Sequence, residues 1–188
     1  SMLSYRHLFH AGSFADVFKH VLLSRLLIAL NQKDKPYFYL DTHAGIGLYD
    51  LSHQWAQKGR EFESGIKKLW ERKDAPAAMK PFLDAVRQEN ADGHLRYYPG
   101  SPRIARRMIR PIDRIALTEL NKTDCAELHE LFARDRRVAL EPTRQCECGC
   151  RLRFHADAQR LDALEQHPGI ERRQGRARGA QEREDLFH

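Results

Sequence analysis

The hydrophobic pattern near the start of the chain predicts a long helix. Ser13 suits a helix N-cap, and Asp16 follows three residues later, as in a capping box. Apolar residues then recur at helical spacing, at positions 14, 17, 18, 21, 22, 26, 29 and 30. So broad an apolar face predicts a helix buried against a sheet, with Lys19 and His20 off that face near its first turns.

The next segment has the pattern of a strand followed by a ligand-binding loop. Residues 37–40 form a short aromatic and apolar run, which predicts a buried strand. The run leads into Asp41 and then a loop that contains His43, Gly45 and Gly47. A strand, an acid and a glycine loop in this order are typical of a nucleotide-binding α/β unit, and a simple strand–helix turn is the alternative interpretation.

Helical and strand patterns alternate over the following residues. The stretch 51–92 is amphipathic and predicts helices around 62–70 and 79–86. The later pattern predicts, in order, a helix over 104–109, a strand over 114–120, a helix over 121–132 and a strand from 138. Glu119 ends the second strand, where a dinucleotide-binding unit places its ribose-binding acid. The long gap before it predicts a helical insertion over about residues 51–95, after the first strand.

Composition divides the chain near residue 140. The 188 residues carry a net charge of +6. Residues 141–188 contain nine Arg, no Lys and nine acidic residues, so the whole charge excess precedes them. They also contain no Val, Tyr, Trp or Met, which predicts a poorly ordered tail without buried strands.

Other features of the sequence narrow the class of protein. No apolar run approaches the ~20 residues of a membrane helix, and the polar start does not resemble a secretory signal, so we expect a soluble cytoplasmic protein. Cys146, Cys148 and Cys150 lack the spacing of zinc ligands, and we expect no metal. Arginines cluster at 103, 106, 107 and 110 and at 134, 136 and 137, where they suit a nucleic-acid backbone or form a solvated face.

Several segments within residues 2–138 resemble one bacterial family. These segments are 2–7, 9–20, 33–45, 95–102 and 117–120. In this order they resemble the 23S ribosomal RNA large subunit methyltransferase J family. The resemblance implies an α/β fold of the Rossmann-like S-adenosylmethionine-dependent methyltransferase type, with a helical insertion, which methylates N6 of an adenine in 23S rRNA.

The resemblance also implies roles for individual residues. It assigns cofactor binding to Lys19, His20, His43, Ser101 and Glu119. Glu119 is expected to accept hydrogen bonds from the ribose hydroxyls of S-adenosylmethionine. Tyr5 is expected to contact the rRNA substrate, where an aromatic ring can stack on a base.

The chain departs from the family at the catalytic motif. The family has an Asp-Pro-Pro-Tyr motif that orients the adenine N6, and an Asp-Gly pair that contacts the cofactor. The eight prolines of this chain include no adjacent pair, and residues 143–146 read Thr-Arg-Gln-Cys. We therefore assign no catalytic residue, and we expect an incomplete carboxyl-terminal end of the sheet and weak or absent methyl transfer.

These observations predict two parts of the chain. Residues 2–140 are expected to form the N-terminal part of a methyltransferase domain, and residues 141–188 a divergent or out-of-frame tail. The expected partner is 23S rRNA, the expected cofactor is S-adenosylmethionine, and the protein is expected to be a monomer without membrane association. The alternative is a non-catalytic RNA-binding remnant of the same family.

Overall fold

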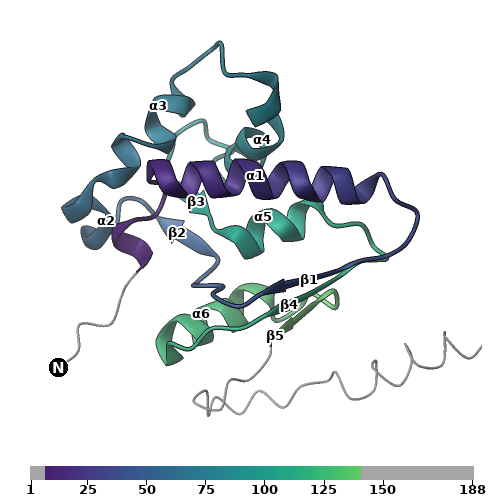
Figure 1. Ribbon diagram of the computed structural model, residues 1–188. Helices are drawn as coiled ribbons and strands as arrows, with labels where there is room; N and C mark the ends of the chain where they lie inside the picture. The colour runs from purple at the N-terminus through teal and green to yellow at the C-terminus, as the bar shows by residue number, and fades with distance from the viewer. Residues whose placement is uncertain (1–6, 141–188) are drawn as a thin grey trace, which may run out of the picture. The chain divides into compact units, whose positions relative to one another are not determined.

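A computed structural model describes residues 7–140, in which helices and strands alternate (Figure 1). The α-helices are α1 (Phe14–Asn31), α2 (Gln54–Gly59), α3 (Ile66–Trp70), α4 (Lys80–Glu89), α5 (Ser101–Met108) and α6 (Lys122–Phe132). Short 3₁₀ helices are η1 (His7–Phe9), η2 (Glu61–Glu63) and η3 (Ala77–Met79). The strands are β1 (Phe38–Asp41), β2 (Leu48–Asp50), β3 (Tyr97–Pro99), β4 (Arg114–Leu117) and β5 (Val138–Leu140).

The larger sheet is parallel, with the strand order β1-β4-β5. Asp41 at the end of β1 lies beside Leu117 of β4, which in turn lies beside Leu140 of β5. The chain moves in one direction across this sheet, through α5 and then through α6. Right-handed crossovers in one direction place both helices on the same face, which confirms the predicted Rossmann-like arrangement.

One apolar cluster joins the two helices to that face of the sheet. Ile115 and Leu117 of β4 are fully buried in it, together with Leu128 and Phe132 of α6. Ile109, just after α5, belongs to the same cluster and is 5% exposed. The burial of these large side chains is the main force that holds α5 and α6 against the strands.

The prediction of a buried strand at residues 37–40 is wrong for half of its side chains. Tyr37 and Tyr39 pack partly against the apolar cluster, whereas Phe38 and Leu40 are 54% and 53% exposed. Successive side chains of a strand point to opposite faces of the sheet. Among the described residues, helices therefore cover the face of Tyr39 and leave Phe38 and Leu40 open to solvent.

Helix α1 begins where the sequence predicts, but it buries a different face. Ser13 is its N-cap and accepts a hydrogen bond from the Asp16 backbone N–H at 3.4 Å. Five large apolar side chains that the pattern assigns to the buried face are 43–70% exposed: Phe14, Phe18, Leu22, Leu26 and Leu30. Val17, which the pattern also assigns to the buried face, is buried, and so are His20 and Leu27, which the pattern does not assign to it.

The helix packs mainly on α5 and α4. Helix α5 contacts both α1 and the strands β1 and β4, so it lies between α1 and the sheet (Figure 1). Because α1 is apolar on more than one side, its spacing alone does not determine which side faces a neighbour. Most contacts of α1 are thus with helices, while its Leu27 belongs to the same apolar cluster as Ile115 and Leu117 of β4.

A small antiparallel pair of strands joins the two ends of the helical stretch. Strands β2 and β3 pair, with Leu48 beside Pro99 and Asp50 beside Tyr97. Helices α2, α3 and α4 lie between them in sequence. The helical character of residues 51–92 is confirmed, whereas the two strands are absent from the sequence prediction because each has only three residues.

The predicted helix over residues 62–70 is broken at Gly65. At this position the chain passes so close to the start of α1 that an added Cβ would lie 2.1 Å from the Gly12 carbonyl oxygen. The Ile66 backbone N–H donates to the same oxygen at 2.9 Å. Gly65 thus joins the helical insertion to α1, and any side chain here would push the two apart.

Candidate functional site

The centre of the candidate site is Asp41, at the carboxyl end of β1. Its Oδ2 accepts hydrogen bonds from the Tyr39 hydroxyl at 3.0 Å and from the Ser101 hydroxyl at 2.6 Å. Its Oδ1 accepts the His43 backbone N–H at 3.1 Å. Asp41 therefore joins the end of β1 and the loop that follows it to Ser101, the first residue of α5, which is 60 residues away in the sequence.

Glu119 holds the other side of the same loop. One of its carboxylate oxygens accepts the Gly45 backbone N–H at 2.8 Å, and the other accepts the Asn121 backbone N–H at 2.8 Å. The backbone reinforces this arrangement, because the Ala44 N–H donates to the Thr118 carbonyl oxygen at 3.0 Å. The two acids thus fix the glycine loop between adjacent strand ends, and each Glu119 oxygen keeps a lone pair for a further donor.

Both glycines of the loop have left-handed backbone conformations. Gly45 has φ +62° and Gly47 has φ +78°. An added Cβ at Gly45 would lie 2.2 Å from the Tyr49 hydroxyl oxygen, and one at Gly47 would lie 2.8 Å from a methyl carbon of Leu131. The loop conformation therefore requires glycine at both positions, for backbone and for steric reasons.

Three of the five predicted cofactor-binding residues meet at this loop. Ser101 and Glu119 are half-buried at the ends of neighbouring elements, and the His43 side chain is exposed and hydrogen-bonded to the Thr42 hydroxyl at 2.9 Å. Sequence reasoning placed Asp41 in the motif but not among the site residues. Its position as the acid directly after the strand is the signal that could have found it.

Lys19 and His20 form a separate cluster on α1. Their neighbour Asp16 is almost fully buried, and it accepts hydrogen bonds from the Gly12 backbone N–H at 3.2 Å and pairs with His7 at 2.8 Å. The Lys19 ammonium lies 2.8 Å from the same carboxylate. Burial acts to raise the pKa of Asp16, but the His7 and Lys19 partners outweigh it and lower the pKa to about 2.

His20 is buried, contrary to the expectation that it lies on the polar side of α1. It is 5% exposed, and its Nδ1 forms a hydrogen bond with the Tyr98 hydroxyl at 2.7 Å. Burial lowers the pKa of His20 to about 4, although the negative charges of Asp16 and Asp41 act in the opposite direction. Tyr98, the partner of His20, precedes Ser101 of the strand-end site by three residues.

Some predicted residues lie outside the described part of the chain. Tyr5, the expected substrate contact, precedes residue 7, and the three cysteines near 148 follow residue 140. The same holds for the expected tail, residues 141–188. Within residues 7–140, no group of three or more His, Cys, Asp or Glu side chains could hold a metal ion, and no helix is long and apolar enough to cross a membrane.

The arginine cluster of α5 makes contacts inside the protein. Arg103 and Arg107 both pair with Glu89 of α4, at 2.7 Å. Arg110 pairs with Asp113 at 2.9 Å. The pairs with Glu89 connect α5 to α4, and the Arg110–Asp113 pair lies within the segment between α5 and β4. All three pairs neutralise positive charge that the sequence analysis considers for binding a phosphate backbone.

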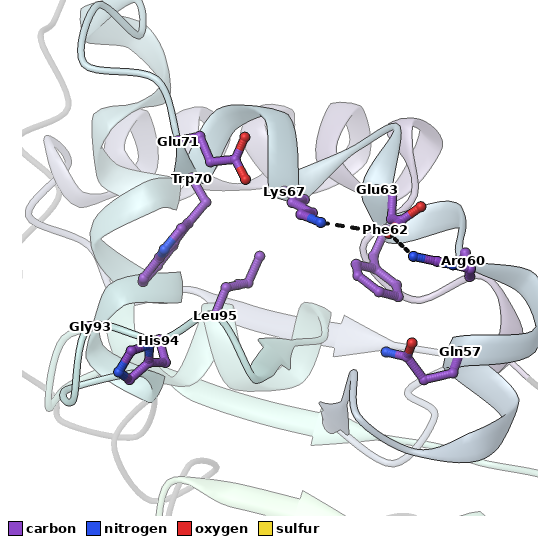
Figure 2. A pocket seen from close by; sticks show the side chains of 10 residues that line it. All are labelled: Gln57, Arg60, Phe62, Glu63, Lys67, Trp70, Glu71, Gly93, His94 and Leu95. Carbon is purple, nitrogen blue, oxygen red and sulfur yellow. Dashed lines mark hydrogen bonds and ion pairs between the residues drawn. The ribbon is translucent and has the colours of Figure 1, made fainter.

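One hollow among the described residues, of about 430 Å³, is lined by Ile46 of the glycine loop, by Tyr49 of β2 and by Asp124 of α6. Another, of about 380 Å³, lies in the helical insertion and is lined by Phe62, Lys67, Trp70 and His94 among others (Figure 2). Glu63 in its wall pairs with Arg60 and with Lys67. Neither hollow is lined by Asp41 or Glu119, so the candidate site is assigned from its convergent polar groups.

The fold and the site define a class of protein. A parallel sheet with a glycine loop after its first strand, and acids at the carboxyl ends of two adjacent strands, is the arrangement of Rossmann-like nucleotide-binding proteins. A model of the family described as ribosomal RNA large subunit methyltransferase D, RlmJ, matches residues 34–148, which is more than half of the chain. The chain therefore belongs to the RlmJ family of methyltransferases.

Curated relatives and a solved structure agree with this assignment. The chain is 46% identical over 140 residues to ribosomal RNA large subunit methyltransferase J of Escherichia coli, and 43% identical over 141 residues to that of Haemophilus influenzae. Each match covers 74% of this chain and 50% of the relative, so the chain spans about half the length of the relatives it matches.

A solved structure is also matched over about half of its length. It is the crystal structure of protein LPL1258 from Legionella pneumophila, with 37% sequence identity and a TM-score of 0.66. The match covers 85% of this chain and 54% of the Legionella chain. The fold described above thus corresponds to about half of a larger relative.

Proposed function

We propose that this chain provides the S-adenosylmethionine-binding part of a 23S rRNA adenine-N6 methyltransferase. The observation that carries the proposal is the strand-end site, in which Asp41 and Glu119 fix a glycine loop beside Ser101. Membership of the RlmJ family supplies the reaction class.

The groups at the site suit the proposed cofactor. S-adenosylmethionine carries a positive sulfonium and a positive ammonium group, and the carboxylates of Asp41 and Glu119 provide negative charge at the strand ends. Each Glu119 oxygen that accepts a backbone N–H retains a lone pair that can accept a ribose hydroxyl. When bound, the cofactor supplies the methyl group for transfer to N6.

The roles of the remaining residues follow from their positions. Ser101 and His43 lie at the same loop and are proposed to contact the cofactor directly. His20 is proposed to stabilise the site indirectly, through its hydrogen bond to Tyr98. Lys19 is proposed to stabilise it indirectly through its ion pair with Asp16. Tyr5 is proposed to stack on a base of the rRNA.

Calorimetric titration with S-adenosylmethionine tests the cofactor site. We expect saturable binding that is weakened at least tenfold by Glu119→Gln and by Asp41→Asn. Absence of binding by the folded wild-type chain would refute the proposal. Methyl transfer to 23S rRNA is expected to be weak or absent, since the chain has no Asp-Pro-Pro-Tyr.

The missing motif favours a second candidate function, a non-catalytic RNA-binding protein of the same family. The chain has no two adjacent prolines and yet carries a net charge of +6. In this case the chain binds rRNA in a salt-dependent manner but binds no S-adenosylmethionine. A gel-shift titration with 23S rRNA, performed beside the calorimetry, separates the two functions.

A further inference from the structure

One hollow among the described residues has both aromatic and cationic side chains in its walls. It is the hollow of about 380 Å³ in the helical insertion. Trp70 and Phe62 lie on opposite sides of it, with Leu95 between them (Figure 2). Its volume is in the usual range of small-ligand sites, in which apolar walls carry a few polar groups that orient the ligand. None of its lining residues belongs to the strand-end site at Asp41, so it is a separate feature of the molecule.

Trp70 presents an aromatic ring to this hollow. It is the last residue of α3 and is half-buried, because it packs against the apolar cluster that contains Phe82. In Figure 2 its ring stands at one end of the hollow, close to the exposed ring of His94. An indole that is held by the core on one side and borders a hollow on the other suits stacking on a planar group, such as a nucleobase.

Gln57 provides a hydrogen-bonding group on the side of the hollow opposite Trp70 (Figure 2). Its Nε2 donates to the Leu51 carbonyl oxygen at 2.7 Å, which fixes the direction of the amide. The amide has a second N–H and an oxygen with which it can bind a ligand. A group that both donates and accepts is suited to the edge of an unpaired base, which carries donors and acceptors side by side.

Positive charge is concentrated around the hollow. Arg60 and Lys67 share one carboxylate, that of Glu63, at 2.6 Å and 3.6 Å, and Glu71 is the second acid of the lining. The lining is therefore balanced in charge, but its surroundings are not. Residues 57–73 contain six Lys and Arg against three Glu, a net charge of +3, which is half of the net charge of the whole chain. All six cations are exposed, so this surface attracts a polyanion.

The backbone of Arg60 has an unfavourable conformation for an arginine. With φ 51°, Arg60 is the one non-glycine residue in the left-handed region among residues 7–140. It follows α2 at a position where glycine is usual. The turn leads directly into η2, and Arg60 and Glu63 at its two ends both line the hollow. Strained positions of this kind concentrate at binding sites, which agrees with a ligand at this place.

We propose that this hollow binds one unpaired nucleotide of an RNA strand. The base stacks on Trp70 and its edge meets the amide of Gln57, while the neighbouring phosphates lie at Arg60 and Lys67. Proteins bind single-stranded nucleic acids by this combination of aromatic rings for the bases and cations for the backbone. The site rests on the proposed function for its partner, rRNA, and its nucleotide is distinct from the adenine that accepts the methyl group.

The test titrates the 188-residue chain into a labelled single-stranded RNA of 23S rRNA sequence and measures fluorescence anisotropy. Trp70→Leu, which keeps an apolar side chain but removes the flat ring, is expected to weaken binding by about fivefold or more. Trp70→Phe keeps a ring that can stack and is expected to retain most of the affinity. Trp55→Leu is the matched control, because Trp55 does not line this hollow, and it is expected to bind like wild type.

Tryptophan fluorescence gives a second readout, which a merely structural role of Trp70 would not change. The chain has two tryptophans, at positions 55 and 70, so in Trp55→Leu the whole signal comes from Trp70. Single-stranded RNA is expected to quench this signal until the site is saturated. The same RNA in a fully paired duplex is expected to bind through charge alone and to leave the signal unchanged. Lys67→Gln is expected to lower the salt dependence of single-strand binding by about 0.7 units of slope.

The outcomes separate the nucleotide site from the cofactor site. Four results would each overturn the nucleotide site: no binding of single-stranded RNA by the wild-type chain, equal affinities of Trp70→Leu and Trp55→Leu, unchanged Trp70 fluorescence, or equal quenching by the duplex. If circular dichroism shows that Trp70→Leu is unfolded, the Trp70 signal and the Lys67→Gln titration decide the question. Absence of S-adenosylmethionine binding refutes the cofactor site and leaves the nucleotide site standing.

Discussion

At the scale of single residues, the sequence pattern does not predict which polar groups are buried. Asp16 and His20 lie on adjacent turns of α1 and are almost fully buried. Each is stabilised by partners from other parts of the chain, His7 for the acid and Tyr98 for the imidazole. Buried polar groups are tolerated only when they are paired in this way.

His20 makes stability depend on pH. Its pKa falls from the ordinary 6.5 to about 4, because burial disfavours the charged ring. In the unfolded chain the ring takes up a proton below pH 6.5, whereas in the folded chain it stays neutral down to about pH 4. Acidification across this window therefore lowers the free energy of unfolding, by roughly 3 kcal/mol from this one group.

Urea unfolding at pH values between 7 and 4 measures this effect. The wild-type chain is expected to lose stability steadily below pH 6.5. His20→Gln, which keeps a hydrogen-bonding group for Tyr98, is expected to show a flatter profile. Parallel profiles for the two proteins would contradict a depressed pKa at His20.

Glu119 is expected to act on both the loop and the cofactor. In Glu119→Gln one carboxylate oxygen becomes an NH₂ group that faces a backbone N–H, so the unfolding free energy should fall by about 1–3 kcal/mol. Cofactor affinity should fall at least tenfold in calorimetry. Glu130→Gln, at an exposed position of α6, is the control and should change neither quantity.

At the scale of elements, the sequence pattern predicts where helices lie better than which side they bury. Helices α1 and α6 begin and end within two residues of their predicted positions, and α4 begins within one residue but ends three residues later than predicted. The buried side of α1 was predicted wrongly. Its apolar residues occupy more than one stripe, and contacts with α5 and α4 determine which stripe is covered.

A matched pair of truncations tests which side of α1 is buried. Leu27→Ala is expected to lower the free energy of unfolding by about 2–5 kcal/mol, since Leu27 is 2% exposed. Leu22→Ala, on the same helix but 51% exposed, is expected to change it by less than about 0.5 kcal/mol. Similar losses in chemical denaturation would show that both stripes are covered.

Gly65 is expected to be intolerant of any side chain. Gly65→Ala places a carbon against the Gly12 carbonyl and should cost about 3 kcal/mol or more, because neither backbone can move freely. Gly93 has φ +82° but no neighbour within 4 Å of an added Cβ. Gly93→Ala should therefore cost only about 1–2 kcal/mol in the same thermal or urea measurement, for conformational reasons alone.

At the scale of the whole molecule, the positive charge is distributed less simply than the sequence suggests. Arg103 and Arg107 are occupied by Glu89, and Arg110 by Asp113. Lys68 and Lys73 of the helical insertion are exposed. Counterion release depends on charges that can reach phosphates, so the exposed lysines are the better candidates for contact with RNA.

Gel-shift titrations over a range of salt concentrations test this distribution. Lys68→Gln and Lys73→Gln are expected to weaken binding to 23S rRNA and to lower the salt dependence, by about one unit of slope for each lost contact. Arg107→Gln should mainly reduce stability, since it breaks the pair with Glu89. A larger loss of RNA affinity from Arg107→Gln than from the lysine variants would contradict this assignment.

The sequence by itself determined the family, the parallel α/β pattern and the glycine loop, because these depend on short contiguous motifs such as residues 41–47. The tertiary structure decided how the acids are used. Asp41 and Glu119 approach the same loop only because β1 and β4 are parallel neighbours, so their carboxyl ends meet. Burial of His20 and exposure of Phe18 and Leu22 likewise depend on which elements pack together, and that is set by contacts between residues distant in the sequence.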